Sequence, residues 1–270
     1  KAGALFSPKD VKPSFLQRLP WGVRHYQWYL PLMPLAIERF NLSDFDLVIS
    51  SSSAFAKGVL TPPETLHLCY CHTPTRYLWT DSHSYVSELA YPVFVKMAIP
   101  FVLTRLRLWD RMAADRVDGF VANSQNVARR ILKYYRRPSD IIHPPVEVGQ
   151  FALGRPKNYY LAGGRLVSYK RFDLLIQAFN KLGIPLKIFG EGPAGESLRA
   201  MAKKNIEFLG KVTDNQRAEL YRESLAFLHP QVEDFGITPI ESMASGRPVL
   251  AYGQGGALET VLPGKTGMFF

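Results

Sequence analysis

The second half of the chain alternates short apolar runs with segments of helical periodicity, and this alternation constrains the fold more than any other feature. Apolar runs of strand length lie at 159–162, 186–189, 206–209, 226–229, 248–251 and 267–270. The helix-period segments between them are 172–181, 195–203, 214–222 and 238–245. Strands that alternate with helices of this length are typical of βαβ units. The pattern therefore predicts an α/β fold with a parallel, doubly wound sheet.

The first half shows the same alternation less regularly. Strands are predicted at 45–50, 66–71, 120–122 and 141–142, and a helix at 125–135. The stretch 146–158 has few apolar residues and is predicted to link two α/β domains. We therefore expect two Rossmann-like domains, 1–150 and 151–270, that bind ligands at the carboxyl ends of their strands.

The composition is that of a globular chain and excludes several classes of protein. The 270 residues are 47% apolar and 21% charged, unlike collagen-like, disordered and disulfide-scaffold proteins. The longest apolar stretch, 91–103, contains Lys96 and two prolines and is shorter than the roughly 20 residues of a membrane span. The two cysteines indicate a reducing compartment. We therefore expect a soluble protein of the cytoplasm.

The net charge of +10 is compatible with a nucleic-acid partner, but the distribution of the charged residues argues against one. Residues 1–150 contain 18 Lys and Arg against 12 Asp and Glu, and the remainder contains 15 against 11, so the excess is +6 and +4. A nucleic-acid footprint would be concentrated in a stripe. Basic residues between aromatic ones at 21–29, and the apolar stretch 91–103, instead predict peripheral contact with an anionic membrane.

Two glutamates separated by seven residues follow the predicted strand 226–229. Glu233 lies in a loop, whereas Thr238 and Glu241 form a capping-box pattern at the start of a helix. Backbone N–H groups at such a helix start bind phosphate, and carboxylates accept hydrogen bonds from sugar or ribose hydroxyls. Glu241 has an alternative role as a helix cap, but Glu233 has no cap to supply. The segment therefore predicts a site for a phosphorylated, hydroxyl-rich ligand.

A second candidate site follows the predicted strand 159–162. Gly163 and Gly164 allow close approach of the backbone, and Arg165 and Lys170 place two cations before the next helix. Cations and helix N–H groups that converge in this way favour a diphosphate. The alternative is a solvated basic turn.

Two further motifs are weak signals. The stretch 190–195 matches G-x-G-x-x-G, but a dinucleotide site expects an acidic residue at the end of the next strand, and Glu207 lies near its start. We interpret the stretch as a glycine turn that lines a ligand site. Asp44 and Asp46 spell D-x-D, the pattern of some metal-dependent sugar transferases, but they precede a strand, at the wrong edge of the sheet.

Histidines and cysteines gather near the end of the predicted strand 66–71. His67, Cys69 and Cys71 share one face of a strand and His72 points to the other, so no metal site is predicted. The two cysteines are also poorly placed for a mutual disulfide. His72 follows the strand, and both a functional role and a place in the core stay open for it.

Taken together, these stretches make the chain resemble the GT-B glycosyltransferases of family 4, the retaining group that includes bacterial mannosyltransferases. The resemblance rests on Glu233 and Glu241, on Gly164, Arg165 and Lys170, and on the segments 189–193, 244–249 and 255–260. In the first half, 45–53, 71–77 and 123–124 resemble the mannosyl-transferring branch.

The resemblance implies a fold, an activity and a set of site residues. Two parallel-sheet domains would face each other across a cleft, the first on the acceptor side and the second binding a nucleotide sugar. The enzyme would transfer a hexose with retention, mannose from GDP-mannose, to a lipid-linked or polysaccharide glycan, at the cytoplasmic membrane face. No metal would be needed, because fixed cations and helix dipoles can stabilise the leaving diphosphate. The implied donor-binding residues are Gly164, Arg165, Lys170, Gly190, Val212, Phe235, Gly236, Ile237 and Glu241, and the implied catalytic residues are His72 and Glu233.

The resemblance is incomplete at both ends. The family carries a glycine-rich loop after its first strand and returns a C-terminal helix to the first domain, and neither is present, so we expect a fragment. Two alternatives stay open: a nucleotide-sugar epimerase on the same fold, and a donor-binding fragment without turnover. A glycosidase is not expected, because no opposed carboxylate pair of the hydrolase type is visible.

Overall fold

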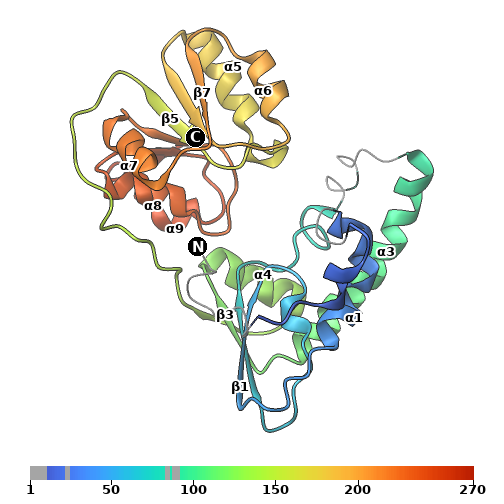
Figure 1. Cartoon of the computed structure of the whole chain (residues 1–270). Helices are drawn as coiled ribbons and strands as arrows, with labels where there is room; N and C mark the ends of the chain where they lie inside the picture. Colours follow the sequence, from blue (N-terminus) through green and yellow to red (C-terminus); the bar gives the residue numbers. More distant parts are fainter. Residues whose placement is uncertain (1–10, 22–24, 83–85, 87–91) are drawn as a thin grey trace. The chain divides into compact units, whose positions relative to one another are not determined.

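The computed structural model of the chain describes residues 11–21, 25–82, 86 and 92–270 (Figure 1). The chain divides into two compact units. The first comprises 1–123 and 127–142, and the second comprises 124–126 and 143–270.

The first unit is built on a four-stranded parallel sheet with the order β1-β2-β3-β4. Its strands are β1 (Leu47–Ser52), β2 (Leu66–Cys71), β3 (Gly119–Ala122) and β4 (Asp140–Ile141). In the register of β1 and β2, Ser51 lies opposite Tyr70 and Ser52 opposite Cys71. The two strands therefore end at the same level, and their carboxyl ends meet at one edge of the sheet.

Among the described helices of the first unit, one packs against this sheet through regularly spaced apolar residues. The described helices are α1 (Met33–Glu38), α3 (Val93–Asp115) and α4 (Gln125–Tyr135), with 3-10 turns at Phe15–Arg18, Tyr26–Leu32 and Ala56–Gly58. In α4, Val127, Ile131 and Tyr135 recur every four residues and are fully buried.

The apolar stretch around residue 100 is part of a continuous helix. The helix α3 contains Pro100 in its interior and runs well past the predicted end of the stretch at 103. In the part of the chain that the structure describes, no helix combines the length and the apolar character needed to cross a membrane.

The second unit contains a six-stranded sheet with the order β10-β9-β8-β5-β6-β7, and every neighbouring pair is parallel. Its strands are β5 (Tyr160–Gly163), β6 (Leu186–Phe189), β7 (Ile206–Gly210), β8 (Phe227–His229), β9 (Val249–Ala251) and β10 (Gly267–Phe269). The predicted doubly wound sheet is therefore confirmed. Its direction of winding reverses between β5 and β8, and ligands of such sheets bind at the carboxyl ends of the strands at that point.

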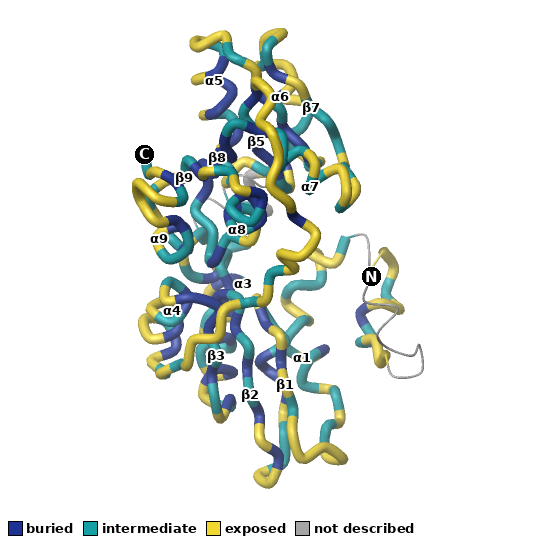
Figure 2. The backbone as a smooth tube through the Cα atoms, turned by 90° about the vertical axis from the view of Figure 1, so that its left-hand side faces the viewer, coloured by how far each residue is buried: buried dark blue, intermediate teal, exposed yellow. Residues whose placement is uncertain are grey.

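Apolar side chains cover both faces of the six-stranded sheet. The helices are α5 (Phe172–Leu182), α6 (Gly195–Met201), α7 (Asp214–Glu223), α8 (Ile237–Ala244) and α9 (Ala257–Thr260). Leu186 and Ile188 belong to one buried cluster, and Leu161 and Phe189 to a second one on the opposite face. Figure 2 shows β5 and β8 as mostly buried.

The structure shows how two helices of the second unit begin. Thr213 caps α7, because its hydroxyl accepts from the Gln216 backbone N–H while the Gln216 side chain accepts from the Thr213 backbone N–H. The capping box predicted at Thr238 is wrong, because Thr238 lies inside α8 and the N-cap is Gly236 with φ of 92°. A left-handed N-cap allows an entry angle to the helix that a threonine would resist.

Candidate functional site

Two glycine turns meet at the carboxyl ends of β5 and β6. Gly164 follows β5 with φ of 135°, and its N–H donates to the Phe189 carbonyl at 3.0 Å. Gly190 follows β6 with φ of 113°, and a Cβ there would collide with the carbonyl oxygen of Gly164. Side chains are therefore excluded from both turns, which explains why glycine occupies positions 164 and 190.

An ion pair joins the loops that follow β5 and β8. Lys170 ends the 3-10 turn Ser168–Lys170, and its Nζ lies 2.9 Å from Oε1 of Glu233. The two side chains are 16% and 22% exposed. A Cβ on Gly164 would lie 3.2 Å from the same Nζ, so the ammonium group lies over the glycine turn. The structure thus brings together three residues predicted for one site, at the point where the sheet reverses.

The loop that carries Glu233 is held by a second pair of glycines. The N–H of Gly256 donates to the Glu233 carbonyl at 2.9 Å. A Cβ on Gly255 would approach the same carbonyl, and a Cβ on Gly256 would collide with the backbone of Phe235. In the sequence these two glycines counted only toward the resemblance, whereas the structure shows that they position the loop.

The start of α8 presents backbone amides without a side-chain cap. Gly236 is the N-cap and makes no side-chain hydrogen bond, Phe235 before it is buried, and Ile237 is the exposed first residue of the helix. The first N–H groups of a helix lack intrahelical partners and carry partial positive charge. The three predicted residues therefore form a helix terminus that can receive an anion.

Glu241 lies on α8 and is buried against Arg217 and Tyr221. Arg217 Nη2 lies 3.3 Å from Glu241 Oε1, and Glu241 is 7% exposed. Burial raises the pKa of Glu241, and the guanidinium of Arg217 opposes that shift. Burial, and next the carboxyl of Glu241, raise the pKa of Tyr221 well above its ordinary value. The helix-cap role considered for Glu241 is wrong, because Glu241 lies in the body of the helix.

Two buried polar residues at the end of β8 were missed by sequence reasoning. His229 is fully buried and Gln231 almost so, and both imidazole nitrogens and the Gln231 Oε1 have no hydrogen-bond partner among the described residues. Burial, and next the nearby Lys170, lower the pKa of His229 to about 3, so its imidazole is neutral. A Cβ on Gly236 would lie 3.7 Å from its Nε2. In the sequence, the one signal for His229 is its position as a polar residue at the end of a predicted apolar strand.

The structure places the other two predicted donor-binding residues, Arg165 and Val212, outside the Lys170–Glu233 contact. Arg165 is exposed and forms no ion pair with the residues that the structure describes. Val212 lies after β7 beside an apolar cluster, and Gly210 near it accepts a hydrogen bond of 2.7 Å from the Gly190 N–H. The ends of β6 and β7 are therefore joined through backbone groups.

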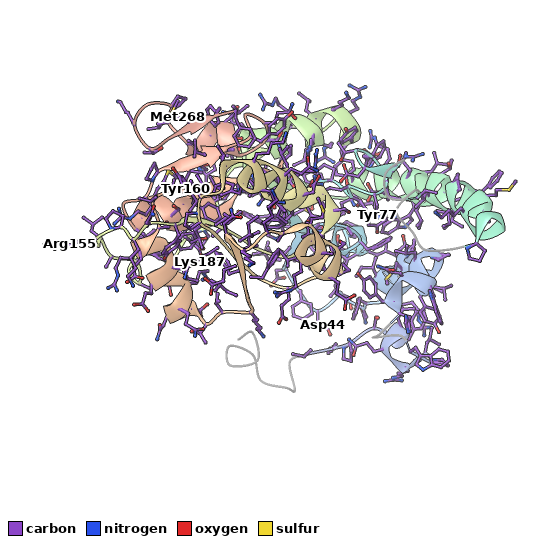
Figure 3. All side chains as sticks on the ribbon, turned by 90° about the horizontal axis from the view of Figure 1, so that it is seen from above. Asp44, Tyr77, Arg155, Tyr160, Lys187 and Met268 are labelled. Atoms are coloured by element: carbon purple, nitrogen blue, oxygen red, sulfur yellow. The ribbon has the colours of Figure 1, made fainter. Side chains whose placement is uncertain are left out.

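His72 belongs to the first unit and directly follows β2. Its Nε2 lies 2.8 Å from the Ser51 Oγ, its carbonyl accepts from Asn123 Nδ2 at 3.1 Å, and it is half-buried. Cys69 and Cys71 are buried free thiols on the other face of β2. Among the described residues, no three His, Cys, Asp or Glu side chains form a group that could hold a metal. Asp44, labelled in Figure 3, lies in the turn before β1.

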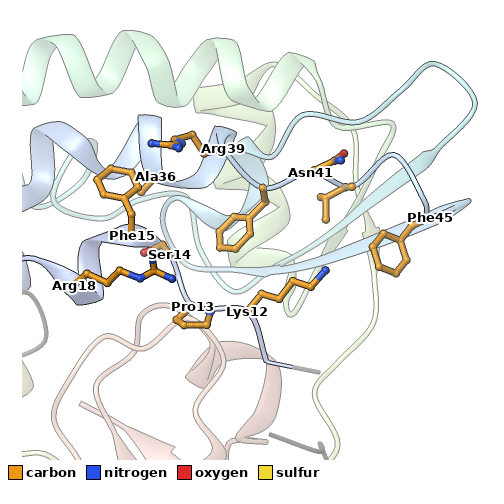
Figure 4. A pocket seen from close by; sticks show the side chains of 11 residues that line it. Lys12, Pro13, Ser14, Phe15, Arg18, Ala36, Arg39, Asn41 and Phe45 are labelled. Carbon is orange, nitrogen blue, oxygen red and sulfur yellow. The ribbon is translucent and has the colours of Figure 1, made fainter. Parts of the chain in front are cut away.

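A separate pocket of about 590 Å³ lies in the first unit and contains none of the predicted site residues. Figure 4 shows the basic side chains of Lys12, Arg18 and Arg39 and the rings of Phe15 and Phe45 around it. The Arg39 guanidinium lies 5.4 Å from the centre of the Phe15 ring.

Comparison with known families decides the family. The description "Glycosyltransferase Family 4" matches residues 5–150, and "Glycosyl transferases group 1" matches residues 147–270. The chain belongs to glycosyltransferase family 4. This confirms the resemblance that the motifs indicated.

Curated relatives are distant and longer. The alpha-1,3/1,6-mannosyltransferase alg2 of Schizosaccharomyces pombe is 26% identical, over 89% of this chain and 54% of its own length. The D-inositol 3-phosphate glycosyltransferase of Mycobacterium tuberculosis is 25% identical, over 84% of this chain and 56% of its own length. The chain therefore spans about half the length of the curated relatives it matches.

Solved structures share the fold. TarM has a TM-score of 0.65 at 18% identity, over 89% of this chain and 48% of its own. HepE of Anabaena in complex with UDP-glucose has a TM-score of 0.56 at 19% identity, over 75% of this chain and 64% of its own. The α/β fold with two parallel sheets is thus that of the GT-B glycosyltransferases, as predicted.

Proposed function

We propose that the protein containing this chain is a retaining glycosyltransferase that transfers a hexose, mannose from GDP-mannose, to a lipid-linked or polysaccharide glycan. The observation that carries the proposal is the Lys170–Glu233 ion pair at the reversal of the six-stranded sheet, beside the uncapped start of α8. One relative is named a mannosyltransferase, and one structural neighbour binds UDP-glucose. The first supports mannose as the sugar, and the second supports a nucleotide sugar as the donor.

In this proposal Lys170 exchanges its carboxylate partner for the donor diphosphate. The ammonium group already faces the glycine turn at Gly164, where backbone can approach phosphate closely. Arg165 adds a second cation, and the backbone amides of Phe235, Gly236 and Ile237 form the rest of the phosphate-binding site. Negative charge develops on the departing diphosphate, and fixed cations and helix amides stabilise it without reorganisation, so no metal cofactor is required.

Release of Lys170 leaves the Glu233 carboxylate available for the hydroxyls of the donor sugar. Glu241, whose Oε2 has no partner among the described residues, is proposed to bind the ribose, and Val212 to lie along the base. His72 is proposed to assist the transfer step. Carboxylates suit this task because each oxygen accepts hydrogen bonds from hydroxyl groups.

The test is turnover of GDP-mannose by the complete polypeptide with a lipid-linked acceptor. We expect Lys170→Ala, Glu233→Ala and His72→Ala each to lower kcat, and Lys170→Ala to do so by roughly 100-fold or more, as when a transition-state contact is removed. Nuclear magnetic resonance of the product reports whether the anomeric configuration is retained.

Lys187→Ala is the matched control, because Lys187 also pairs with a glutamate, Glu207, at 3.1 Å, but on strands β6 and β7. It should keep full turnover. Full activity in all three site variants would show that the site is assigned wrongly. Conversion of the donor without an acceptor would identify an epimerase, and donor binding without any turnover would identify a binding module.

We further propose that the first unit contacts an anionic membrane from the cytoplasmic side. Met97, Phe101, Leu108 and Met112 are each at least 63% exposed, and their spacing places them on one face of α3. The aromatic side chains of Trp21 and Trp28 are also exposed. Residues 22–24 and 91 of the stretches predicted for this contact lie outside the described residues.

Co-sedimentation with vesicles tests the membrane proposal. Binding should increase with the fraction of anionic lipid and decrease with salt, because charge attraction is screened within about 10 Å at 0.1 M salt. Phe101→Ser should weaken it. Binding that is independent of both salt and lipid charge would contradict the electrostatic part.

A further inference from the structure

Two serine–histidine pairs join β1 to the β2 region, one on each face of the sheet. Ser50 Oγ lies 2.9 Å from Nε2 of His67, and this pair is buried. Ser51 Oγ lies 2.8 Å from Nε2 of His72, on the more exposed face. Successive residues of a strand point to opposite faces, so adjacent serines reach two different histidines.

The backbone of His72 is fixed on both sides. Its N–H donates to the Ser52 carbonyl at 2.8 Å, and its carbonyl accepts from Asn123 Nδ2 at 3.1 Å. The imidazole lies edge-on to the ring of Tyr70, with centroids 5.2 Å apart and the planes at 73°. With the backbone held, the orientation of the ring depends on Tyr70 and on the hydrogen bond to Ser51.

The hydrogen bond to Ser51 occupies one of the two ring nitrogens. The Ser51 hydroxyl can either donate or accept, so it holds Nε2 in either tautomer and fixes the direction in which Nδ1 points. No described residue forms a hydrogen bond with Nδ1 of His72, so Nδ1 is the nitrogen left for a ligand.

We propose that Ser51 is a positioning residue that engages Nε2 of His72, fixes the rotation of the imidazole ring and presents Nδ1 to the glycosyl donor. The proposal rests on the role proposed above for His72. It assigns to Ser51 an effect on the transfer step rather than on donor binding, because Ser51 acts only through the ring that it orients.

The kinetic test uses the complete polypeptide with GDP-mannose. Ser51→Ala should lower kcat about ten-fold and leave the KM for the donor within about two-fold, since a hydrogen bond worth about 1.4 kcal/mol corresponds to a factor of ten. Ser51→Thr keeps the hydroxyl and should restore most of the loss. In the His72→Ala background, Ser51→Ala should have no further effect. A tenfold loss that persists in that background would overturn the proposal.

Ser50→Ala is the matched control. It removes the buried hydrogen bond to His67, so it should lower Tm and leave kcat of the folded enzyme unchanged. An equal loss of kcat in both serine variants would mean that the sheet edge is merely disturbed, and this result would reject the positioning role of Ser51.

A second readout is independent of activity. The imidazole ¹⁵N signals of His72, assigned by their loss in His72→Ala, should shift in Ser51→Ala, because Nε2 loses its hydrogen-bond partner. Unchanged signals in Ser51→Ala would overturn the proposal even where kcat falls. If His72→Ala keeps full activity while the signals do change, the proposed function of His72 fails and the Ser51–His72 coupling stands.

Discussion

Each unit contains a cluster of buried polar side chains, and the two clusters differ in how many of their polar atoms have a hydrogen-bond partner. In the first unit, Lys57 and Asp110 are each 1% exposed and form an ion pair. The Asp110 carboxylate also accepts hydrogen bonds of 2.8 Å from Thr75, Trp79 and Tyr135. In the second unit, His229, Gln231, Tyr221 and Glu241 each have at least one buried polar atom without a partner among the described residues.

This difference suggests different roles for the two clusters. The paired cluster stabilises the fold, whereas the unpaired cluster is expected to bind a ligand. Buried polar atoms in folded proteins are nearly always paired, and a satisfied network makes the fold around it rigid. Several unpaired atoms, on α7, on α8 and at the end of β8, carry a free-energy cost that a bound ligand or ordered water removes. The site of the second unit is therefore expected to respond to ligands, and the Asp110 network is not.

The largest effect is expected when the satisfied network is broken. Asp110→Ala leaves the Lys57 ammonium buried without its carboxylate, and such a loss lowers the free energy of unfolding by about 3 to 5 kcal/mol. Urea denaturation measures the change. Asp115→Ala, which removes a carboxylate that is 56% exposed in its pair with Arg111, should cost less than about 1 kcal/mol. Equal costs for the two variants would remove the distinction between them.

A nucleoside diphosphate should stabilise the unsatisfied site. At 100 times its dissociation constant, a ligand that binds only the folded state adds about 2.7 kcal/mol to the free energy of unfolding. The corresponding rise in Tm should be largely lost in Lys170→Met, because the cation that faces the diphosphate is gone. Lys187→Met should retain it. An undiminished rise in Lys170→Met would place the nucleotide elsewhere.

Stability should depend on pH through His229. Its pKa is 6.5 in an unfolded chain and about 3 in the fold, so only the unfolded state takes up this proton between those values. The contribution of His229 is complete above pH 6.5 and falls by about 1.4 kcal/mol per pH unit as the pH drops toward 3. His229→Phe should make the free energy of unfolding less steep in that range. The same slope in both proteins would show that His229 is protonated in the fold.

The smallest effect is expected when a hydroxyl group is removed from one of two fully buried tyrosines. Tyr135→Phe removes a hydrogen bond to the Asp110 carboxylate and should cost about 1 to 2 kcal/mol. Tyr221→Phe removes a hydroxyl that has no described partner and should change the free energy of unfolding by less than about 0.5 kcal/mol. Thermal or urea unfolding measures both. A cost in Tyr221→Phe as large as in Tyr135→Phe would reveal a hydrogen bond to Glu241.

Local pattern was enough to locate most elements of the fold. The bounds 66–71, 186–189 and 125–135 agree with β2, β6 and α4, because strand and helix periods differ clearly in amphipathic or buried segments. The helix α3 was recognised only as an apolar stretch, because Pro100 suggested a break that the helix tolerates. The start of α8 was misjudged because Gly236 adopts a left-handed conformation that no threonine cap resembles.

The candidate site was predicted in part for a similar reason. Gly164, Lys170 and Glu233 follow strands, and the carboxyl ends of parallel strands meet, so their proximity could be expected from the order of elements. His229 and Gln231 were missed because their importance lies in the absence of partners, which no spacing reveals. The pairing of Glu241 with Arg217 was missed because the two residues lie on different helices.

By itself, the sequence determined the parallel sheets, the glycine turns and the family, because periodicity, left-handed backbone positions and motif spacing are local properties of a chain. Only the tertiary structure decided which polar groups are satisfied and which are not. The Asp110 network, the Lys170–Glu233 pair and the contact of Ser51 with His72 each join residues from separate elements. Their geometry depends on strand register and helix packing, and these are set by the folded chain as a whole.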